Sequence, residues 1–405
     1  MDSRLLLLCV GVHAAASSPD PATASAGASL RGDAGDNRQF VVLDGPGETA
    51  RCLDGSPYAF YVWPGNSSDW SVFINGGGWC LTEELCRTRA ATALGSSKGY
   101  NVSGAWGPPP RNLNGGPAAY TCQGLDPNCT RVFLPYCDGS CFASQRPAPW
   151  PVNGSNTTLH FRGLANLERT FDVLEARFGL AKAQRLVLQG GSAGGLSTYL
   201  HLDRVAARLR AAQRRAAADT AAVVAAPPPP PPARVVGRPV AGFFIDEQKF
   251  DPTQPSYADA VKYGVATMFN ATPALSPHCR AAHAGEEWKC WMAPCQTIPD
   301  SRFSFAVGFL KNGLTRFGAA ADAAPFVKEA IFAVQSRFDE FQLMCLLQLP
   351  CFQGQADVPP FLPSNCTQPE RSAIVKFGGE LVAQMQPFLE AKPESGTWLV
   401  SCIQQ

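Results

Sequence analysis

Residues 186–196 read LVLQGGSAGGL, and this stretch decides the fold. The apolar residues 186–188 predict a buried strand, and the pattern of residues 196–209 predicts a helix. Between them, residues 190–194 match the G-x-S-x-G turn, in which glycines let the chain bend sharply and lift the serine hydroxyl clear of the sheet. The N-terminal amides of the next helix point to the same place. The stretch therefore predicts that Ser192 is a catalytic nucleophile.

Further apolar runs with glycine-rich breaks between them predict the rest of a sheet. Several are continuous rather than alternating, which is typical of strands buried on both faces. Apolar residues at 164, 167, 171, 174 and 178 share one face of a predicted helix. Because strands alternate with helices, we expect an α/β-hydrolase fold, a mainly parallel sheet with helices on both faces. The expected strands cover residues 40–43, 59–63, 70–74, 132–134, 186–188, 240–245, 330–334 and 397–400.

The N-terminus has the composition of a secretory signal peptide. A charge at Arg4 precedes apolar residues 5–10 and three alanines at 14–16. We therefore assign residues 1–16 to a signal peptide, and residues 17–36, rich in Ala, Ser, Gly and Pro, to a disordered segment. The apolar run is too short to span a membrane, and no later stretch is long enough. The expected location is extracellular, with the cell wall as one option.

One catalytic domain is expected at residues 37–405, interrupted by a low-complexity segment. Residues 211–239 are rich in alanine and arginine and contain six consecutive prolines at 227–232. We interpret this segment as a surface insertion between the helix after Ser192 and the next strand. A proline run can also bind a partner domain, although no other feature points to one.

Charge and cysteine content narrow the class of protein. Lysine and arginine number 34 against 33 acidic residues, a balance that gives no reason to expect a nucleic-acid partner. Of fifteen cysteines, Cys9 lies in the predicted signal peptide, and the other fourteen suit a disulfide framework in an oxidising compartment. They lack paired C-x-x-C spacing, so we expect no metal ion, and no motif indicates a cofactor. The candidate local disulfides are Cys80–Cys86, Cys122–Cys129 and Cys137–Cys141.

Glycosylation motifs agree with secretion. Seven N-x-S/T sequons beside a signal peptide fit a secreted glycoprotein. They lie at Asn66, Asn101, Asn128, Asn153, Asn156, Asn270 and Asn365.

A serine esterase also needs main-chain amides that hold the oxyanion, and an acid that orients its base. In this fold one amide comes from the residue after the nucleophile, here Ala193, and another from a glycine-rich loop after an earlier strand. Residues 75–80, NGGGWC, follow the predicted strand 70–74 and fit that loop. The acid should follow a late strand, and from the residues alone Asp339 and Asp246 both qualify.

Several motifs along the chain, taken together and in order, resemble those of the pectin acetylesterase and Notum carboxylesterase family of secreted α/β-hydrolases. The resemblance covers roughly residues 40–402 and implies that Ser192 is the nucleophile, that Gly78, Trp79 and Ala193 are oxyanion donors, and that Asp339 is the triad acid. The motifs are GGGWC (76–80), YCDGS (136–140), FRG (161–163), GSAGGL (191–196), GFFID (242–246), FDEFQL (338–343) and SC (401–402).

The resemblance also implies a histidine three residues after a cysteine near the C-terminus. Here residues 401–405 read SCIQQ, so Gln405 takes that position, and a neutral amide is no general base. Two explanations are open: a histidine is encoded beyond Gln405, or the site is inactive. His13 lies in the signal peptide, and the other histidines, His160, His201, His278 and His283, are expected to be packing or surface residues. Because triads occur in different chain orders, His278 and His283 stay open as alternative bases.

These observations predict a secreted carboxylic-ester hydrolase. The resemblance implies that its substrate is an acylated polysaccharide, with O-acetyl groups on a pectin-like chain, or an acylated protein. The alternative is a catalytically inactive secreted glycoprotein of the same fold that binds an ester or a glycan, and Gln405 is its main support.

Overall fold

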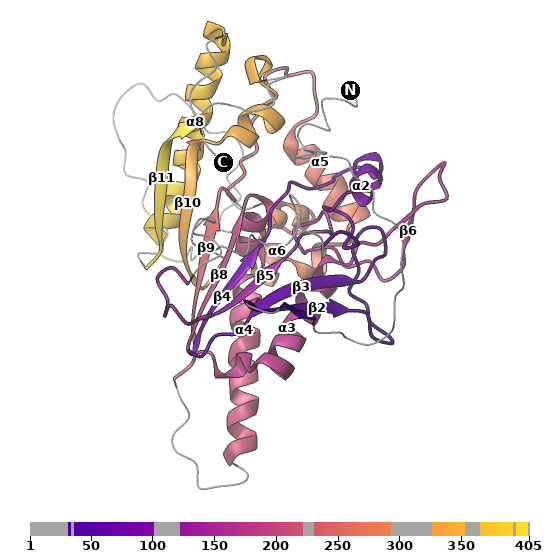
Figure 1. Cartoon of the computed structure of the whole chain (residues 1–405). Helices are drawn as coiled ribbons and strands as arrows, with labels where there is room; N and C mark the ends of the chain where they lie inside the picture. The colour runs from indigo at the N-terminus through magenta and orange to yellow at the C-terminus, as the bar shows by residue number, and fades with distance from the viewer. Residues whose placement is uncertain are drawn as a thin grey trace.

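The computed structural model describes residues 31–33, 36–100, 122–221, 231–292, 326–352, 365–391 and 394–403. Within these residues a nine-stranded sheet has the order β1-β2-β3-β5-β4-β8-β9-β10-β11 (Figure 1). Pairs from β1 to β5 are antiparallel, and all pairs from β5 to β11 are parallel. The strands are β1 (Arg31–Asp33), β2 (Asp36–Leu43), β3 (Tyr58–Trp63), β4 (Asp69–Ile74), β5 (Thr130–Leu134), β8 (Arg185–Gly191), β9 (Arg234–Val240), β10 (Ala330–Phe338) and β11 (Gly396–Ile403), with a separate hairpin of β6 (Trp150–Pro151) and β7 (Thr158–Leu159). The predicted α/β-hydrolase fold is confirmed.

One predicted strand is wrong. Residues 240–245 were expected to be extended in the sheet, but β9 ends at Val240. Its residues alternate between buried and more exposed, and two arginines among them hide the pattern. The apolar run 243–245 is a buried loop instead, whose main-chain amides donate to the side chains of Gln335 and Gln342 rather than to a neighbouring strand.

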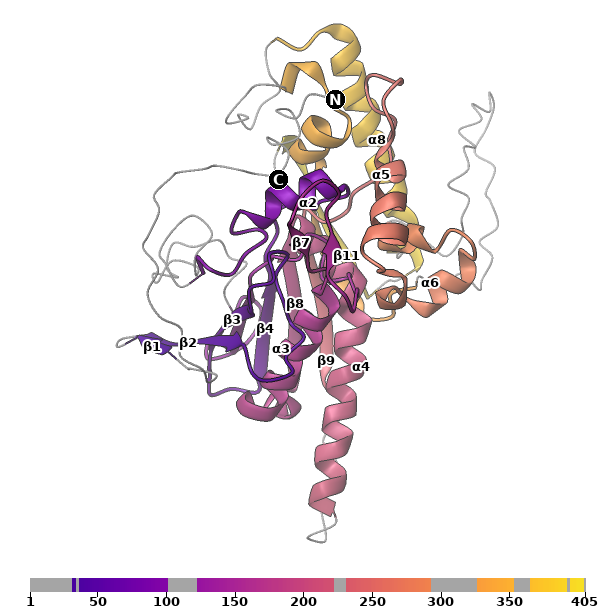
Figure 2. The ribbon, with the colours of Figure 1, turned by 90° about the vertical axis from the view of Figure 1, so that its right-hand side faces the viewer.

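The helices that the structure describes include two that pack side by side on the sheet. Figure 2 shows α3 and α4 along one face, where a Cβ on Gly237 of β9 would lie 2.7 Å from Leu202 of α4. Arg208 of α4 forms ion pairs with Glu168 and Glu175 of α3. The helices are α2 (Glu83–Ala90), α3 (Gly163–Phe178), α4 (Ala193–Ala221), α5 (Tyr257–Tyr263), α6 (Pro277–Ala282) and α8 (Gln368–Ala391), with shorter helical turns at Leu180–Lys182, Gly264–Met268, Thr272–Ala274, Glu287–Trp291, Gln342–Leu346 and Pro350–Phe352.

The structure changes two of the predicted segment boundaries. Helix α4 continues to Ala221 and projects past the sheet (Figure 1), and β9 begins at Arg234, so both ends of the predicted 211–239 insertion are regular structure. Residues 222–230 lie outside the described part of the chain. Residues 31–33, which were expected to be disordered, form β1 and pair with β2 through the main chain. No side-chain pattern in these residues predicts a strand. The predicted signal peptide lies outside the described residues.

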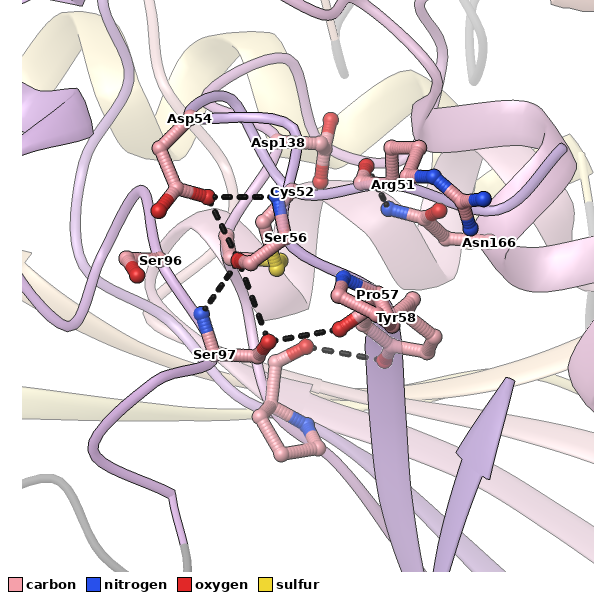
Figure 3. Close-up of a disulfide and its surroundings, with 12 residues drawn as sticks. Arg51, Cys52, Asp54, Ser56, Pro57, Tyr58, Ser96, Ser97, Asp138 and Asn166 are labelled. Carbon is pink, nitrogen blue, oxygen red and sulfur yellow. Dashed lines mark hydrogen bonds between the residues drawn. A yellow bond between two sulfur atoms is a disulfide. The ribbon is translucent and has the colours of Figure 1, made fainter. Parts of the chain in front are cut away.

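Two of the three predicted local disulfides are confirmed, Cys80–Cys86 and Cys122–Cys129. The third is wrong, because Cys137 bonds to Cys52, 85 residues away (Figure 3), and Cys141 is a buried free thiol. Asp138 accepts the amides of Ser140 and Phe142, and this tight turn places the Cys141 thiol 3.8 Å from the Tyr136 hydroxyl. Cys279–Cys290 and Cys351–Cys366 are also bonded, as is Cys345.

The surface of the described part bears on secretion. No helix there combines the length and apolar character that crossing a membrane requires. Six sequon asparagines lie in the described residues and all six are exposed, while Asn101 lies outside them. The six are Asn66, Asn128, Asn153, Asn156, Asn270 and Asn365.

Candidate active site

Ser192 lies on the turn between β8 and α4, at the carboxyl end of the parallel strands. Its backbone has a φ of +55°, a left-handed conformation that a serine rarely adopts and that is found at functional sites. The turn is held by the Ser192 amide, which donates to the Val240 carbonyl at 2.8 Å. Ala193 is the first residue of α4, so its amide has no carbonyl partner within that helix. The predicted elbow therefore has the geometry that its sequence indicates.

The glycine-rich loop 75–80 lies directly against this elbow. A Cβ on Gly76 would lie 2.3 Å from the Gly191 carbonyl oxygen and 3.1 Å from Cβ of Ser192, so only glycine fits there. The loop leaves the carboxyl end of β4, and β4 and β8 are the neighbours at which the strand order reverses. Ligands in open α/β sheets bind at such a point. The start of the loop, at Gly76, thus contacts the Ser192 turn, and the roles of Gly78, Trp79 and Ala193 as oxyanion donors stay predictions.

Asp339 is the residue directly after β10, and its side chain is completely buried. One carboxylate oxygen accepts the Gln342 amide at 2.9 Å, as a helix N-cap does, and the other accepts the Gln335 side chain at 3.0 Å. Burial raises the pKa of Asp339 to about 7, and these hydrogen bonds offset only part of that increase. Asp246, the competing acid, lies six residues beyond β9 and accepts the Ala258 amide, so it no longer ends a strand.

The nucleophile and the acid are separated by one strand, since β9 lies between β8 and β10. Val334 of β10 is level with Val240 of β9 and Gly191 of β8, so Asp339 follows that level by five residues and Ser192 by one. Both residues thus lie toward the carboxyl end of the parallel strands. Their roles as triad nucleophile and acid stay predictions.

An aromatic cluster connects the glycine loop to the turn that carries Asp339. The Trp79 ring lies 4.8 Å from Phe244, 5.4 Å from both Tyr257 and Trp291, and 5.6 Å from Phe341, centroid to centroid. Aromatic rings at these distances are in contact, and each pair adds stabilisation beyond the area it buries. We call Trp79, Phe244, Tyr257, Trp291 and Phe341 the aromatic cluster.

Two glutamines at the site were not anticipated from the sequence. Besides contacting Asp339, the Gln335 side chain accepts the Phe243 amide. The Gln342 side chain donates to the Phe243 carbonyl and accepts the Ile245 amide. They thereby fix the loop after β9 beside the acid. The only signal was that the motifs GFFID and FDEFQL accompany each other, which gave no role for either glutamine.

His201, which lies on the same helix as the Ser192 turn, does not supply a base to Ser192. His201 is buried on α4, nine residues along the chain and about 13 Å along the helix axis, with Nε2 2.9 Å from the Cys141 carbonyl oxygen. Burial lowers the pKa of His201 to about 3, so it stays neutral. His160 packs against Gly55 on the turn after Cys52, and His278 and His283 belong to or follow α6. These positions agree with packing or surface roles.

One histidine lies within a group that resembles a metal site. Potential ligand atoms of Cys279, His283 and Cys290 lie within 4.8 Å of one another. The two sulfurs are bonded to each other, so neither is a thiolate ligand. We assign this group to a disulfide with a histidine packed beside it.

Strand β11 ends next to the acid. It pairs in parallel with β10, and Ile403 is level with Phe338, the residue before Asp339. The base is therefore expected directly after β11, which is where the sequence motif ends in Gln405. Gln405 itself lies outside the described residues.

The strand order, the Ser192 elbow and a buried carboxylate two strands away define an α/β-hydrolase. The chain belongs to the pectinacetylesterase family, whose profile matches residues 33–301. It is 36% identical to Pectin acetylesterase 4 of Arabidopsis thaliana over 164 residues, 38% of this chain and 36% of that one. It is 25% identical to the palmitoleoyl-protein carboxylesterase notum1a of Danio rerio over 305 residues, 72% of this chain and 49% of that one.

The fold comparison agrees with the sequence comparison. The crystal structure of the Wnt deacylase Notum from Drosophila superimposes with a TM-score of 0.61 at 20% identity, covering 91% of this chain and 86% of that one. The matches to the two curated relatives above span less than half of each relative's length.

The buried acid makes a prediction about stability and pH. The folded pKa of Asp339, about 7, exceeds its ordinary value of 3.8, so the folded state binds this proton more tightly than the unfolded chain. The resulting stabilisation is complete below about pH 4 and is lost as pH rises through 7, by about 4 kcal/mol at most. We expect the unfolding free energy of the native chain, measured with urea from pH 4 to 8, to fall relative to Asp339→Asn. A difference between the two proteins that stays constant over this range would contradict the prediction.

Proposed function

We propose that this chain is a serine carboxylesterase that removes acetyl groups from a pectin-like polysaccharide. The contact of the Gly76 loop with the Ser192 elbow supports this most directly, because an oxyanion hole needs a glycine-rich loop beside the nucleophile turn. Ser192 Oγ attacks the acetyl carbonyl carbon, and the amides of Gly78, Trp79 and Ala193 stabilise the oxyanion. The sugar oxygen then leaves with a proton, and water releases acetate from Ser192.

The proton of Ser192 must pass to a base that Asp339 orients. The carboxylate is buried and held at both oxygens, which suits an orienting group better than a group that exchanges protons with solvent. The base in this proposal is a histidine soon after β11, and because the motif position is Gln405 the proposal requires that a histidine follow it. Reading the transcript past codon 405 identifies it.

Similarity to named relatives favours a short acyl group over a long one. The match to a pectin acetylesterase of Arabidopsis thaliana is 36% identical over 164 residues, whereas the match to a palmitoleoyl-protein carboxylesterase of Danio rerio is 25% identical over 305 residues. We therefore favour an acetylated polysaccharide as the substrate over an acylated protein.

A chain-length comparison tests the substrate class. We expect the full protein to hydrolyse p-nitrophenyl acetate with a kcat/KM at least about 100-fold above p-nitrophenyl palmitate, and to release acetate from acetylated pectin. The same protein should leave a palmitoleoylated peptide intact. A preference for the long acyl chain would assign the lipid substrate instead, and no hydrolysis of any ester would count against an esterase.

Secretion belongs to this proposal. Five disulfides in the described residues are typical of an oxidising compartment, and the six exposed sequon asparagines are accessible to glycosylation. A polysaccharide substrate would place the protein at the cell wall.

The second candidate is an inactive glycoprotein that binds an ester or glycan. Its support is that Gln405 occupies the motif position of the histidine. Binding of acetylated pectin without acetate release, together with a transcript that encodes no later histidine, would establish it.

A further inference from the structure

Helix α2 carries a fully buried arginine whose side chain reaches the glycine loop. Arg89 has no exposed surface. Its Nη1 donates to the Gly77 carbonyl at 2.7 Å, and its Nε donates to the Leu94 carbonyl at 2.9 Å. Burial lowers the pKa of Arg89, so a charge held here costs free energy that the two carbonyls and the Tyr136 ring, 4.9 Å away, help to offset. A buried charge with this free-energy cost is expected to have a structural or functional role.

The peptide that Arg89 contacts is the one that carries a proposed oxyanion donor. In a trans peptide the carbonyl of Gly77 and the amide of Gly78 point in opposite directions. Both residues have positive φ, +131° and +63°, and two glycines in sequence let their shared peptide plane rotate at little cost. A rotated plane would aim the Gly77 oxygen where the Gly78 amide now points, and a carbonyl dipole there would repel a developing oxyanion.

We propose that Arg89 is a positioning residue that holds the 77–78 peptide in the orientation that presents the Gly78 amide to the substrate. The inference rests on the proposed function, since it assigns a role within the same oxyanion hole. Arg89 touches neither substrate nor reacting atoms in this scheme.

The frame around Arg89 is rigid enough for such a role. The Cys80–Cys86 disulfide ties the loop to α2, and a Cβ on Gly77 would lie 2.5 Å from the Leu94 side chain. The segment after Leu94 is fixed in turn to the Cys52 turn shown in Figure 3. There the Ser97 amide donates to the Ser56 hydroxyl at 3.0 Å. Two residues earlier in the chain, the Gly95 carbonyl accepts the Asp54 amide at 3.0 Å. Arg89 therefore bridges two anchored segments.

Two substitutions in the full protein test the proposal. Arg89→Gln removes the charge and shortens the reach, and Arg89→Lys keeps the charge but supplies one compact donor group for two carbonyls. We expect Arg89→Gln to lower kcat for p-nitrophenyl acetate about 100-fold with little change in KM, as removal of one oxyanion donor does, and Arg89→Lys to fall between. The affinity for a trifluoromethyl ketone, which forms a tetrahedral adduct on the serine, should fall in parallel.

The matched control is Arg146→Gln. Arg146 also donates to two main-chain carbonyls, of Met268 and Thr267, and lies 4.2 Å over the Trp150 ring, away from the glycine loop. Each variant is assayed at a temperature where circular dichroism shows it folded. If folded Arg89→Gln keeps the kcat and inhibitor affinity of Arg146→Gln, the proposal is overturned.

A second readout separates this proposal from the esterase proposal. If the native protein hydrolyses no ester, the proposed function fails, and a crystal structure of Arg89→Gln still decides the role of Arg89. A rotated 77–78 peptide, with faster amide exchange at Gly78, supports the positioning role. An unchanged peptide orientation refutes it.

Discussion

In a protein of residues 1–405, replacing Gln405 with histidine is expected to raise kcat/KM for p-nitrophenyl acetate by about 10³-fold or more, the cost of a missing triad histidine in serine hydrolases. The reason is geometric. The β10–β11 register ends with Ile403 level with Phe338, the residue before Asp339, and Asp339 is buried and already hydrogen-bonded at both oxygens. A histidine at position 405 would have, in Asp339, a carboxylate already fixed by hydrogen bonds to orient its ring.

Gln404→His is the matched control for this gain. It adds the same imidazole one residue before the position at which the motif has its histidine. We expect it to leave hydrolysis near the level of the native chain. Equal gains from both variants would show that untethered imidazole chemistry, rather than a triad, produces the activity. No gain from Gln405→His would show that position 405 is not where the catalytic base acts.

The elbow could be predicted because its chemistry is local. A buried strand, a glycine-flanked serine and a helix follow one another within residues 186–209, and each step is constrained by neighbouring residues. The same holds for the loop 75–80, whose glycines are required by the close approach of Gly191 and Ser192. The two elements also lie at the reversal of strand order, which only the structure shows.

The support for the acid could not be predicted, because it comes from residues distant in sequence. Gln335 and Gln342 hold Asp339 and also bind main-chain groups of Phe243 and Ile245, about a hundred positions earlier. From the sequence, an apolar run such as residues 243–245 is equally compatible with a strand. It forms a loop because the side-chain oxygens of the two glutamines accept its main-chain amides in place of a neighbouring strand. The unpaired Cys141 is a similar case, since its neighbour Cys137 bonds to Cys52.

Ser192→Ala is expected to have the largest effect of all. In the Gln405→His background we predict a loss of kcat of about 10⁵-fold or more, because no other described group replaces the attacking oxygen in the elbow. The fold should tolerate the change, since the Ser192 amide, which bonds the Val240 carbonyl, is retained and alanine is smaller than serine. Acetate release from acetylated pectin and p-nitrophenyl ester hydrolysis measure the loss.

Ser197→Ala supplies the comparison for that experiment. Ser197 is buried on the same helix, and its hydroxyl donates to the Ala193 carbonyl at 2.8 Å, a local bond that helices lose with little consequence. Activity that survives in Ser197→Ala and disappears in Ser192→Ala would assign the nucleophile to one hydroxyl. If Ser192→Ala keeps the gain that Gln405→His brings, the ester is being cleaved without an acyl-serine intermediate, and the role of the elbow would have to be reconsidered in favour of a bound water as the nucleophile.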